Sequence, residues 1–381
     1  MPDLASNMVE PTGGFQMQGM MMRYNLFMPR LYNWCLSLGF KSGKIMPSRA
    51  FCSDESQGYP VIMIAKHFGT FPFNHGLVGG IVDTHRHGPH AEHGEDLVII
   101  QASHVGYDPQ SQTFGTYRRL QTADNEDSPN CGKVDNVITW YKNEYQFAQQ
   151  NILLHQINGM NCIIVDNQLL REDLDEGLLL HLDKLIETDS NGQHLPFKIL
   201  STAKVFAASS EFVEKIGESA FMGKKPEPIG SELTSDIFYF RREIPHIKEG
   251  VHHLEHNLIR FMPQIITAQF PILTASQINT QIEFDLTFRT IVKEHSYRGK
   301  KLLFISGLNI DISPQSGQLF PLTKFVPWAA YVQDSDGSYS TFEQLELMQI
   351  LEQQSVSNPD QIDMEAAIQG MTEAKEIKVH L

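Results

Sequence analysis

The chain has 381 residues, of which 41% are hydrophobic and 20% are charged, the composition of an ordinary globular protein. Its formal net charge of −15 argues against nucleic acid as a partner, because binding phosphate groups needs a basic surface. The same charge offers little attraction to anionic membranes, and no apolar run approaches the roughly 20 residues of a membrane-spanning helix. We therefore expect a soluble protein with neither nucleic acid nor membrane among its partners.

The cysteine content and the N-terminus bear on the compartment. Four cysteines in a chain of this length do not make a disulfide framework, which favours a reducing compartment. The N-terminus has no basic segment followed by an apolar core, so no secretory signal is visible. Because a transit peptide can be removed from a mature chain, both plastid and cytoplasm fit this pattern.

Taken in chain order, the first half alternates helical and strand-like patterns. Residues 1–19 contain Gly, Met and Pro and are expected to form a flexible lead-in. Residues 20–38 carry apolar side chains at helical spacing, with Gly39 as the end of the helix. Helical patterns return at 136–156 and 168–187. Between them lie short apolar runs typical of strands buried on both faces, at residues 60–65, 97–101 and 162–165.

The second half contains further strand and helix patterns after a loop at residues 223–230. We find no internal repeat and no long low-complexity linker. The sequence therefore predicts a single elaborated α/β domain over residues 20–381. Its central sheet is expected to be mainly parallel and flanked by helices, with a C-terminal extension.

Histidine and cysteine are concentrated in residues 52–131. Seven of the 16 histidines and two of the four cysteines lie in this fifth of the chain. Imidazole and thiolate are preferred ligands of Zn²⁺, and a set of two cysteines and one histidine leaves one tetrahedral position for water. The segment therefore predicts a catalytic zinc site.

Position along the predicted fold selects Cys52, His104 and Cys131 as the ligands. His104 follows the predicted strand at residues 97–101, and ligands gather beyond the carboxyl ends of strands in open α/β sheets. Cys52 precedes the first predicted strand, and Cys131 lies in a glycine-containing turn. A single buried cysteine is more often a small hydrophobic residue, and this is what we expect of the two others, Cys35 and Cys162.

An acidic residue with an arginine, and a run of histidines, are candidates for catalytic roles beside the metal. Asp54 lies two residues after a ligand cysteine; held by Arg86, it would stay ionised and accept a hydrogen bond from zinc-bound hydroxide. An ordinary surface salt bridge is the plainer interpretation. In the run from His85 to His90, His85, His87 or His90 could carry protons, and His87 is taken as the catalytic candidate. The same run is also typical of a solvated polar loop.

Five motifs together resemble a known family. CSDE, HFGTFPFNHG, DTHRHGPHAEHGED, HVGYDP and CGK are similar to the Cys-Gly-His-rich domain of the limiting-CO2-inducible B/C proteins of algae, which are grouped with the theta-class carbonic anhydrases. The run LFPLTKFVPWAAYVQ at residues 319–333 extends the resemblance over most of the chain. The resemblance implies a fold and zinc site related to β-class carbonic anhydrases, an Asp–Arg dyad and a homodimer.

Carried over by residue, Cys52, His104 and Cys131 match the ligands and Asp54 matches the dyad carboxylate. The dyad arginine of the β-class pattern falls on Ser56 here, so the dyad is assigned to Arg86. The second cysteine of that pattern falls on Tyr107, so Cys131 must come from a separate loop.

The expected function is zinc-dependent carbonic anhydrase activity, the reversible hydration of CO2 to bicarbonate by zinc-bound hydroxide. Two alternatives remain at this point. One is metal-assisted hydrolysis of an ester or amide, which needs a cleft for a sizeable substrate. The other is a catalytically silent zinc protein that acts through partners in a CO2-concentrating mechanism, with Asp54 as a permanent fourth ligand.

Overall fold

The computed structural model describes residues 14–76, 96–118, 127–129, 131–171, 173, 175–244, 250–315, 317–318 and 320–376. Contacts between residues divide the chain into two compact units. The first contains Met1–Lys133 and Ser276–Leu381, and the second contains Val134–Ala275. Whether residues 20–381 behave as one domain stays a prediction.

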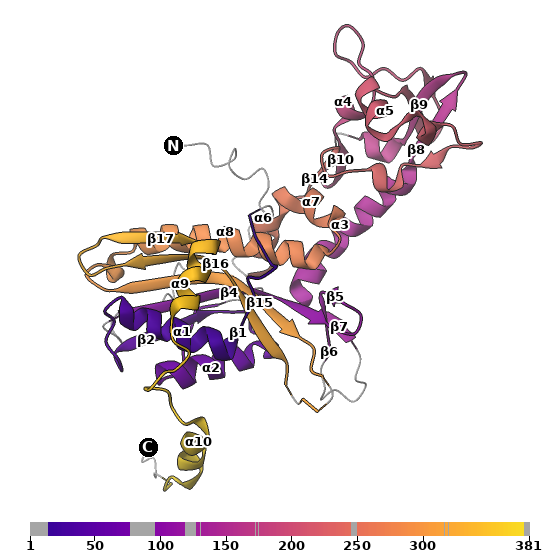
Figure 1. Cartoon of the computed structure of the whole chain (residues 1–381). Helices are drawn as coiled ribbons and strands as arrows, with labels where there is room; N and C mark the ends of the chain where they lie inside the picture. The colour runs from indigo at the N-terminus through magenta and orange to yellow at the C-terminus, as the bar shows by residue number, and fades with distance from the viewer. Residues whose placement is uncertain are drawn as a thin grey trace, which may run out of the picture. The chain divides into compact units, whose positions relative to one another are not determined.

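The first unit is built on a mixed eight-stranded sheet (Figure 1). Its strand order is β1-β16-β15-β4-β2-β3, with β17 beside β16 and β5 beside β4. Strands β3, β2, β4 and β15 run parallel to one another, and the other pairs are antiparallel. The bounds are β1 (Met22–Arg23), β2 (Ile45–Ala50), β3 (Phe73–Asn74), β4 (Asp96–Asp108), β5 (Thr113–Phe114), β15 (Leu302–Ile312), β16 (Leu322–Gln333) and β17 (Tyr339–Glu343).

The predicted α/β class agrees with this unit, but the prediction of a mainly parallel sheet is not confirmed. The reason is that β15 and β16 pair antiparallel, and β17 pairs antiparallel with β16 in turn. The long pairing of β15 with β16 shifts register between Ser306 and Gly307. A Cβ at Gly307 would lie 2.4 Å from the Val326 carbonyl oxygen, so only glycine allows this close approach.

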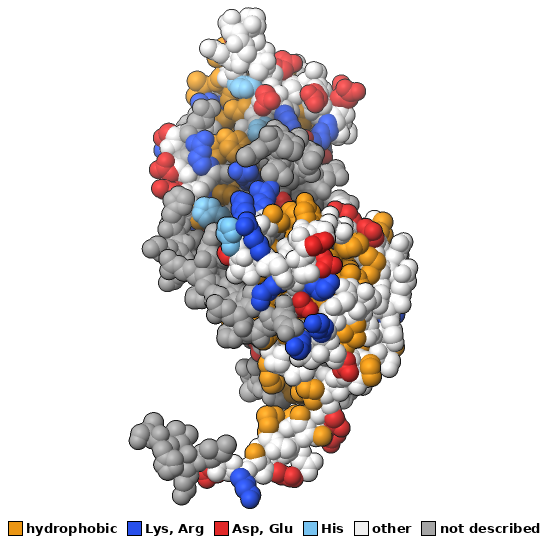
Figure 2. Space-filling model, turned by 90° about the vertical axis from the view of Figure 1, so that its left-hand side faces the viewer, with side chains coloured by type: hydrophobic (Ala, Val, Ile, Leu, Met, Phe, Trp, Pro, Cys, Tyr) orange, Lys and Arg blue, Asp and Glu red, His pale blue; other side chains and the backbone are white. Residues whose placement is uncertain are grey.

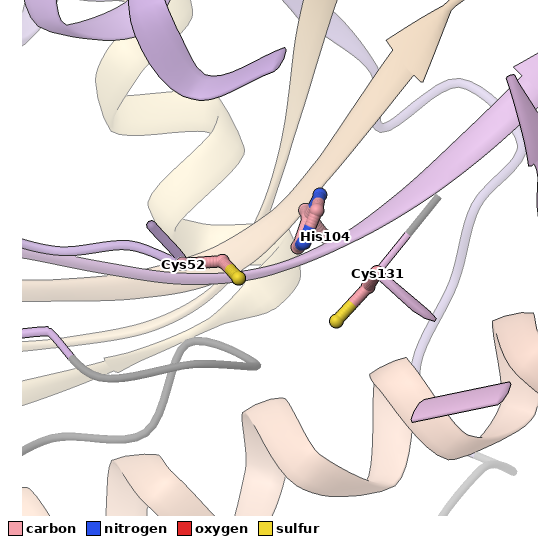
Figure 3. Close-up of side chains that lie close together, drawn as sticks. All are labelled: Cys52, His104 and Cys131. Atoms are coloured by element: carbon pink, nitrogen blue, oxygen red, sulfur yellow. The ribbon is translucent and has the colours of Figure 1, made fainter. Parts of the chain in front are cut away.

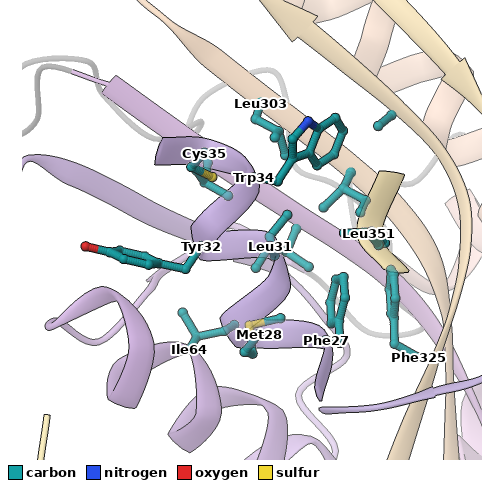
Figure 4. Packing of buried hydrophobic residues seen from close by; sticks show 14 of the residues in the cluster. Phe27, Met28, Leu31, Tyr32, Trp34, Cys35, Ile64, Leu303, Phe325 and Leu351 are labelled. Carbon is teal, nitrogen blue, oxygen red and sulfur yellow. The ribbon is translucent and has the colours of Figure 1, made fainter. Parts of the chain in front are cut away.

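Helices cover both faces of the sheet (Figure 1). On one face, α1 (Tyr24–Ser37), α2 (Gly58–Phe68) and α9 (Gln344–Gln353) pack on the sheet around Phe27, Leu31 and Phe325 (Figure 4). On the other face, Phe284, Phe288 and Ile291 of α8 (Pro271–Lys293) contact β4 and β15. The unit also contains η1 (Glu55–Gln57), η6 (His295–Tyr297), α10 (Met364–Glu373) and the antiparallel pair of β6 (Thr116–Arg118) with β7 (Asp127–Pro129).

Two sequence predictions for this unit have opposite outcomes. The strand predicted at 97–101 is confirmed and extends over Asp96–Asp108. The strand predicted at 60–65 is wrong, because these residues belong to α2. Pro60, Met63, Ile64 and His67 are buried while Ile62 is 48% exposed, which is the spacing of one helix face. A short continuous apolar run does not distinguish a buried strand from a buried helix.

The second unit is built on a five-stranded antiparallel sheet in the order β11-β12-β9-β8-β13, with a separate pair of β10 and β14. The strand predicted at 162–165 is confirmed as part of β9, whereas the helix predicted at 168–187 is wrong, because that stretch contains η2, β10 and α4. The bounds are α3 (Gly132–Asn151), β8 (Ile152–Ile157), β9 (Met160–Asp166), η2 (Asn167–Leu170), β10 (Gly177–Leu180), α4 (Leu182–Leu185), β11 (Lys198–Ile199), β12 (Ala203–Ala207), α5 (Ser210–Ile216), η3 (Glu218–Phe221), β13 (Glu227–Pro228), η4 (Gly230–Glu232), β14 (Phe238–Arg241), α6 (Gly250–Leu258), η5 (Ile259–Phe261) and α7 (Met262–Thr267).

The described residues bear on membrane spanning and on the distribution of surface charge. None of their helices is both long and apolar enough to cross a membrane. Figure 2 shows acidic and basic side chains interspersed on one face of the molecule, so the net charge of −15 does not form one uniform patch there.

Candidate metal centre

Cys52, His104 and Cys131 converge in the first unit (Figure 3). Their candidate ligand atoms all lie within 4.8 Å of one another. Cys52 is two residues beyond β2, His104 belongs to the last part of β4, and Cys131 immediately precedes α3. The exposed fractions are 4% for Cys52, 1% for His104 and 1% for Cys131. The structure therefore brings together the three residues that the sequence selected, and they could bind a metal ion.

The parallel strands explain why these residues meet. Because β2, β4 and β15 run in the same direction, the residues at their carboxyl ends lie at one edge of the sheet. Gly76 allows a second close approach beside this edge, since a Cβ there would lie 2.3 Å from the Phe51 carbonyl oxygen. The chain just before Cys52 is thus held by backbone packing that no larger residue permits.

Cys131 has an unusual backbone conformation. Its φ angle is +55°, in the left-handed region that residues other than glycine rarely adopt. Such a conformation costs on the order of 1–3 kcal/mol and persists only where the surrounding fold imposes it. The residue also lies at the N-terminal end of the 20-residue helix α3, whose dipole would stabilise the thiolate that forms when a metal ion displaces the thiol proton.

His104 is oriented by a buried carboxylate. Its Nδ1 lies 2.9 Å from Oδ2 of Asp311, a residue of β15, and both side chains are fully buried. Its Nε2 is buried and has no hydrogen-bond partner in the described part of the chain. A buried imidazole nitrogen without a partner is costly unless something else uses its lone pair. A metal ion between the imidazole and the two sulfurs would use it.

Asp311 is the centre of a buried polar network. Its Oδ2 accepts hydrogen bonds from Ser56 Oγ at 2.8 Å and from Gln57 Nε2 at 2.8 Å, in addition to His104 Nδ1. Its Oδ1 accepts from Thr323 Oγ1 at 3.0 Å. Imidazole ligands of metals almost always donate their second N–H to such a partner. The arrangement is therefore one in which His104 is prepared for metal binding.

The electrostatics of the cluster make proton loss part of metal binding. Burial alone would lower the pKa of His104, but the Cys131 sulfur and the bond to Asp311 outweigh it and hold this pKa well above its ordinary value. The neighbouring Cys52 thiol and burial both raise the pKa of Cys131. A metal ion must displace these protons, since thiolate and neutral imidazole are the ligand forms.

Asp54 lies next to the cluster but does not join it. Its carboxylate caps η1 by accepting from the Ser56 backbone N–H at 3.1 Å. Burial would raise the pKa of Asp54, but the positive charge of His104 and the Ser56 amide together lower it. Among the described residues only the two cysteines and His104 form a candidate metal group. The predicted partners Arg86 and His87 lie outside the described residues, as do His85 and His90.

The donor set fits zinc. Two thiolates and one imidazole are soft and borderline ligands of the kind that Zn²⁺ prefers, and catalytic zinc sites use three protein ligands with one open position. The fit rests on the chemistry of the donors and on the unpartnered His104 Nε2.

Sequence reasoning missed the residues that support the ligands, chiefly Asp311, Asn309 and Gln57. A signal was present in β15, whose run LFISGLNIDI carries Asn309 and Asp311 at alternate positions of a strand that is otherwise apolar except for Ser306. Both are fully buried. Polar residues two apart on a buried strand point to one face and indicate a polar site there.

Comparison with known proteins gives likenesses in structure only. No family model matches the chain, and no curated protein matches it in sequence. The crystal structure of PtLCIB4, a homolog of the limiting CO2-inducible protein LCIB, is 12% identical with a TM-score of 0.47, covering 87% of this chain and 97% of that one. The crystal structure of LCIB itself is 13% identical with a TM-score of 0.43, covering 90% of this chain and 100% of that one. Both likenesses extend over most of this chain and of the matched chain.

Proposed function

We propose that the chain is a zinc-dependent carbonic anhydrase that interconverts CO2 and bicarbonate at Cys52, His104 and Cys131. The observation that carries the proposal is the buried Cys2His cluster, whose imidazole is oriented by Asp311 and keeps an unpartnered Nε2. When bound there, zinc supplies a nucleophilic hydroxide near neutral pH by acidifying water. Two thiolates leave less positive charge on the metal than three imidazoles would, so we expect a working pH on the alkaline side.

Burial of the ligands favours a small, uncharged substrate. The exposed fraction of each ligand residue is 4% or less. A site of this kind suits CO2 better than an ester or amide of appreciable size, and we therefore do not favour the hydrolase alternative. The low dielectric around buried groups also strengthens the electrostatic interactions among them.

Asp54 is proposed to orient the nucleophile. Its lowered pKa keeps the carboxylate ionised at neutral pH, so it can accept a hydrogen bond but not donate one. We propose that Arg86 restrains it and that His87, or His85 or His90, carries the proton away. Support for these three roles comes from the sequence motifs, and the homodimer is likewise proposed on the resemblance of those motifs.

The catalytically silent zinc protein remains the second candidate, because full burial of the ligands also suits a closed site. There Asp54 would complete the coordination. X-ray absorption of the zinc-loaded chain distinguishes the two, since a closed site has a carboxylate oxygen in place of a water oxygen, and an Asp54→Ala variant would change the coordination only in that case.

Stopped-flow CO2 hydration on zinc-quantified protein tests the proposal. We expect turnover well above the buffer rate, lost together with zinc in Cys52→Ala. Cys162→Ala is the matched control, because Cys162 is a buried cysteine outside the cluster. About one zinc per chain with no turnover at any pH would contradict the proposal and favour the closed site.

A further inference from the structure

A directed chain of hydrogen bonds leads from helix α1 to the candidate metal centre. Tyr24 Oη donates to Asn309 Oδ1 at 2.6 Å, and Asn309 Nδ2 donates to Gln57 Oε1 at 2.7 Å. Gln57 Nε2 then donates to Asp311 Oδ2 at 2.8 Å. Because the phenol is the first donor, each amide has one allowed orientation. Burial raises the pKa of Tyr24 well above its ordinary value, so the phenol keeps the proton that sets this direction.

Three neighbouring side chains donate hydrogen bonds to the Asp311 carboxylate. Ser56 Oγ and Gln57 Nε2 both reach Oδ2, and Thr323 Oγ1 reaches Oδ1. A carboxylate oxygen that accepts these hydrogen bonds is complemented by a further donor and not by a lone pair. The group that faces it from His104 must therefore be an N–H.

This requirement decides between two states of the His104 ring. Gln57 Nε2 lies 3.3 Å from His104 Nδ1, so in principle Nδ1 could accept from that amide. The Asp311 oxygen is closer, at 2.9 Å, and an Nδ1 lone pair facing a carboxylate oxygen at that distance would be repelled. When a metal ion displaces one of the ring protons, the proton that remains is therefore the one on Nδ1, and the Nε2 lone pair is directed away from Asp311.

We propose that Asp311 is a positioning residue that fixes the tautomer and orientation of His104 for metal binding, with Ser56, Gln57 and Thr323 holding the carboxylate in place. The proposal rests on the zinc site of the proposed function, but not on CO2 hydration. In this chain Ser56 would act on the metal ligand indirectly, because it donates a hydrogen bond to the Asp311 carboxylate that orients His104.

Zinc affinity of an Asp311→Asn variant tests the role. The amide has nearly the same shape, and its oxygen can still accept at the position of Oδ2, so the fold is retained while the charge is removed. We expect the zinc dissociation constant, measured by competition with a chelator, to rise about 10- to 100-fold, the usual effect of losing such a partner. Asp311→Ala removes the bond altogether and should weaken zinc binding further.

The control is Glu255→Gln, the same chemical change at a buried carboxylate of the second unit. Glu255 accepts hydrogen bonds from Tyr141 Oη and Arg242 Nη1, both at 2.7 Å, and it does not belong to the metal cluster. We expect Glu255→Gln to lower stability without changing zinc affinity. An effect on zinc equal to that of Asp311→Asn would show a general loss of stability and overturn the proposal.

The His104 ring proton supplies a readout that a merely structural role would not move. In zinc-loaded protein labelled with ¹⁵N-histidine, the Nδ1 proton should resonate far downfield because it is bonded to a carboxylate, and it should move upfield in Asp311→Asn. An unchanged resonance with unchanged zinc affinity would overturn the proposal. If the parent chain binds zinc but does not hydrate CO2, the proposed function fails while these measurements still decide the role of Asp311.

Discussion

Two buried histidines of the segment from His67 to Gly76 contrast with His104 on β4. All three rings are buried, with exposed fractions of 4% for His67, 4% for His75 and 1% for His104. Burial and nearby Lys66 lower the pKa of His67 to about 4, and burial and nearby Arg49 lower that of His75 to about 3. The pKa of His104 is instead raised, because thiols and a carboxylate surround it.

The difference shows which histidines of a histidine-rich segment are suited to a metal. His67 Nδ1 contacts the amide of Asn358 at 3.2 Å, and His75 Nδ1 contacts Ser48 Oγ at 2.5 Å. These are neutral partners of ordinary core histidines. His104 has an anionic partner on one nitrogen and two sulfurs near the other. The surroundings of a buried ring, rather than local histidine density, therefore indicate the candidate ligand.

The largest expected effect is on zinc binding, when His104 or His75 is replaced by glutamine. His104→Gln should abolish stoichiometric zinc binding, because it removes the only imidazole of the described cluster. His75→Gln should leave about one zinc per chain, because its ring contacts Ser48 and not the sulfurs. Metal analysis after gel filtration measures both. Loss of zinc in both variants to the same extent would contradict the distinction between the two histidines.

The next effect is on stability in acid. The pKa of His75 is about 3 in the folded chain, against an ordinary value of 6.5, so between these values only the unfolded chain gains the proton. Stability is therefore fully present above pH 6.5 and is lost as the pH falls below it, by up to about 1.4 kcal/mol per pH unit for each such histidine. Denaturant unfolding between pH 4 and 7 measures this slope.

The matched variants for that slope are His75→Gln and His295→Gln. His75→Gln should make the slope shallower because it removes a group that is neutral only when folded. His295 is exposed, and its replacement should leave the slope as it is. Equal slopes in the parent chain and in His75→Gln would refute this origin of acid sensitivity.

The sequence was a good guide to the residue types of the site and a poor guide to their support. Cys52, His104 and Cys131 could be selected because thiols and imidazoles near predicted strand ends are few. Asp311 is 207 residues beyond His104, and it reaches the ring through the parallel pairing of β15 with β4. Nothing local in a sequence specifies the register of two parallel strands, because no turn joins them.

The fold was predictable to the same degree. The continuous apolar pattern of β4 identified a buried strand, and the α/β class followed from the alternation of elements. The same kind of pattern gave a wrong prediction at residues 60–65. These residues form part of the buried helix α2, and their continuous apolar sequence is the same as that expected of a buried strand. The mixed character of the sheet was missed because the antiparallel pairing of β15 with β16 is a long-range choice between two apolar runs.

The smallest of the expected effects would make His67 resemble His104 in one respect. Asn358 Nδ2 lies 3.2 Å from His67 Nδ1, so Asn358→Asp places a carboxylate beside this ring with little change in shape. An opposite charge at such a distance raises the pKa of a histidine by about 1–3 units, so the pKa of His67 should rise from about 4 toward its ordinary value. A histidine NMR titration of the folded chain measures the change, with Asn358→Ala as the control that removes the amide without adding charge.

Zinc stoichiometry should not increase, because no thiol lies beside His67 among the described residues. An unmoved pKa would mean that burial and Lys66 outweigh a neighbouring carboxylate, whereas a raised pKa without added zinc would show that the two sulfurs, in addition to the carboxylate, set His104 apart.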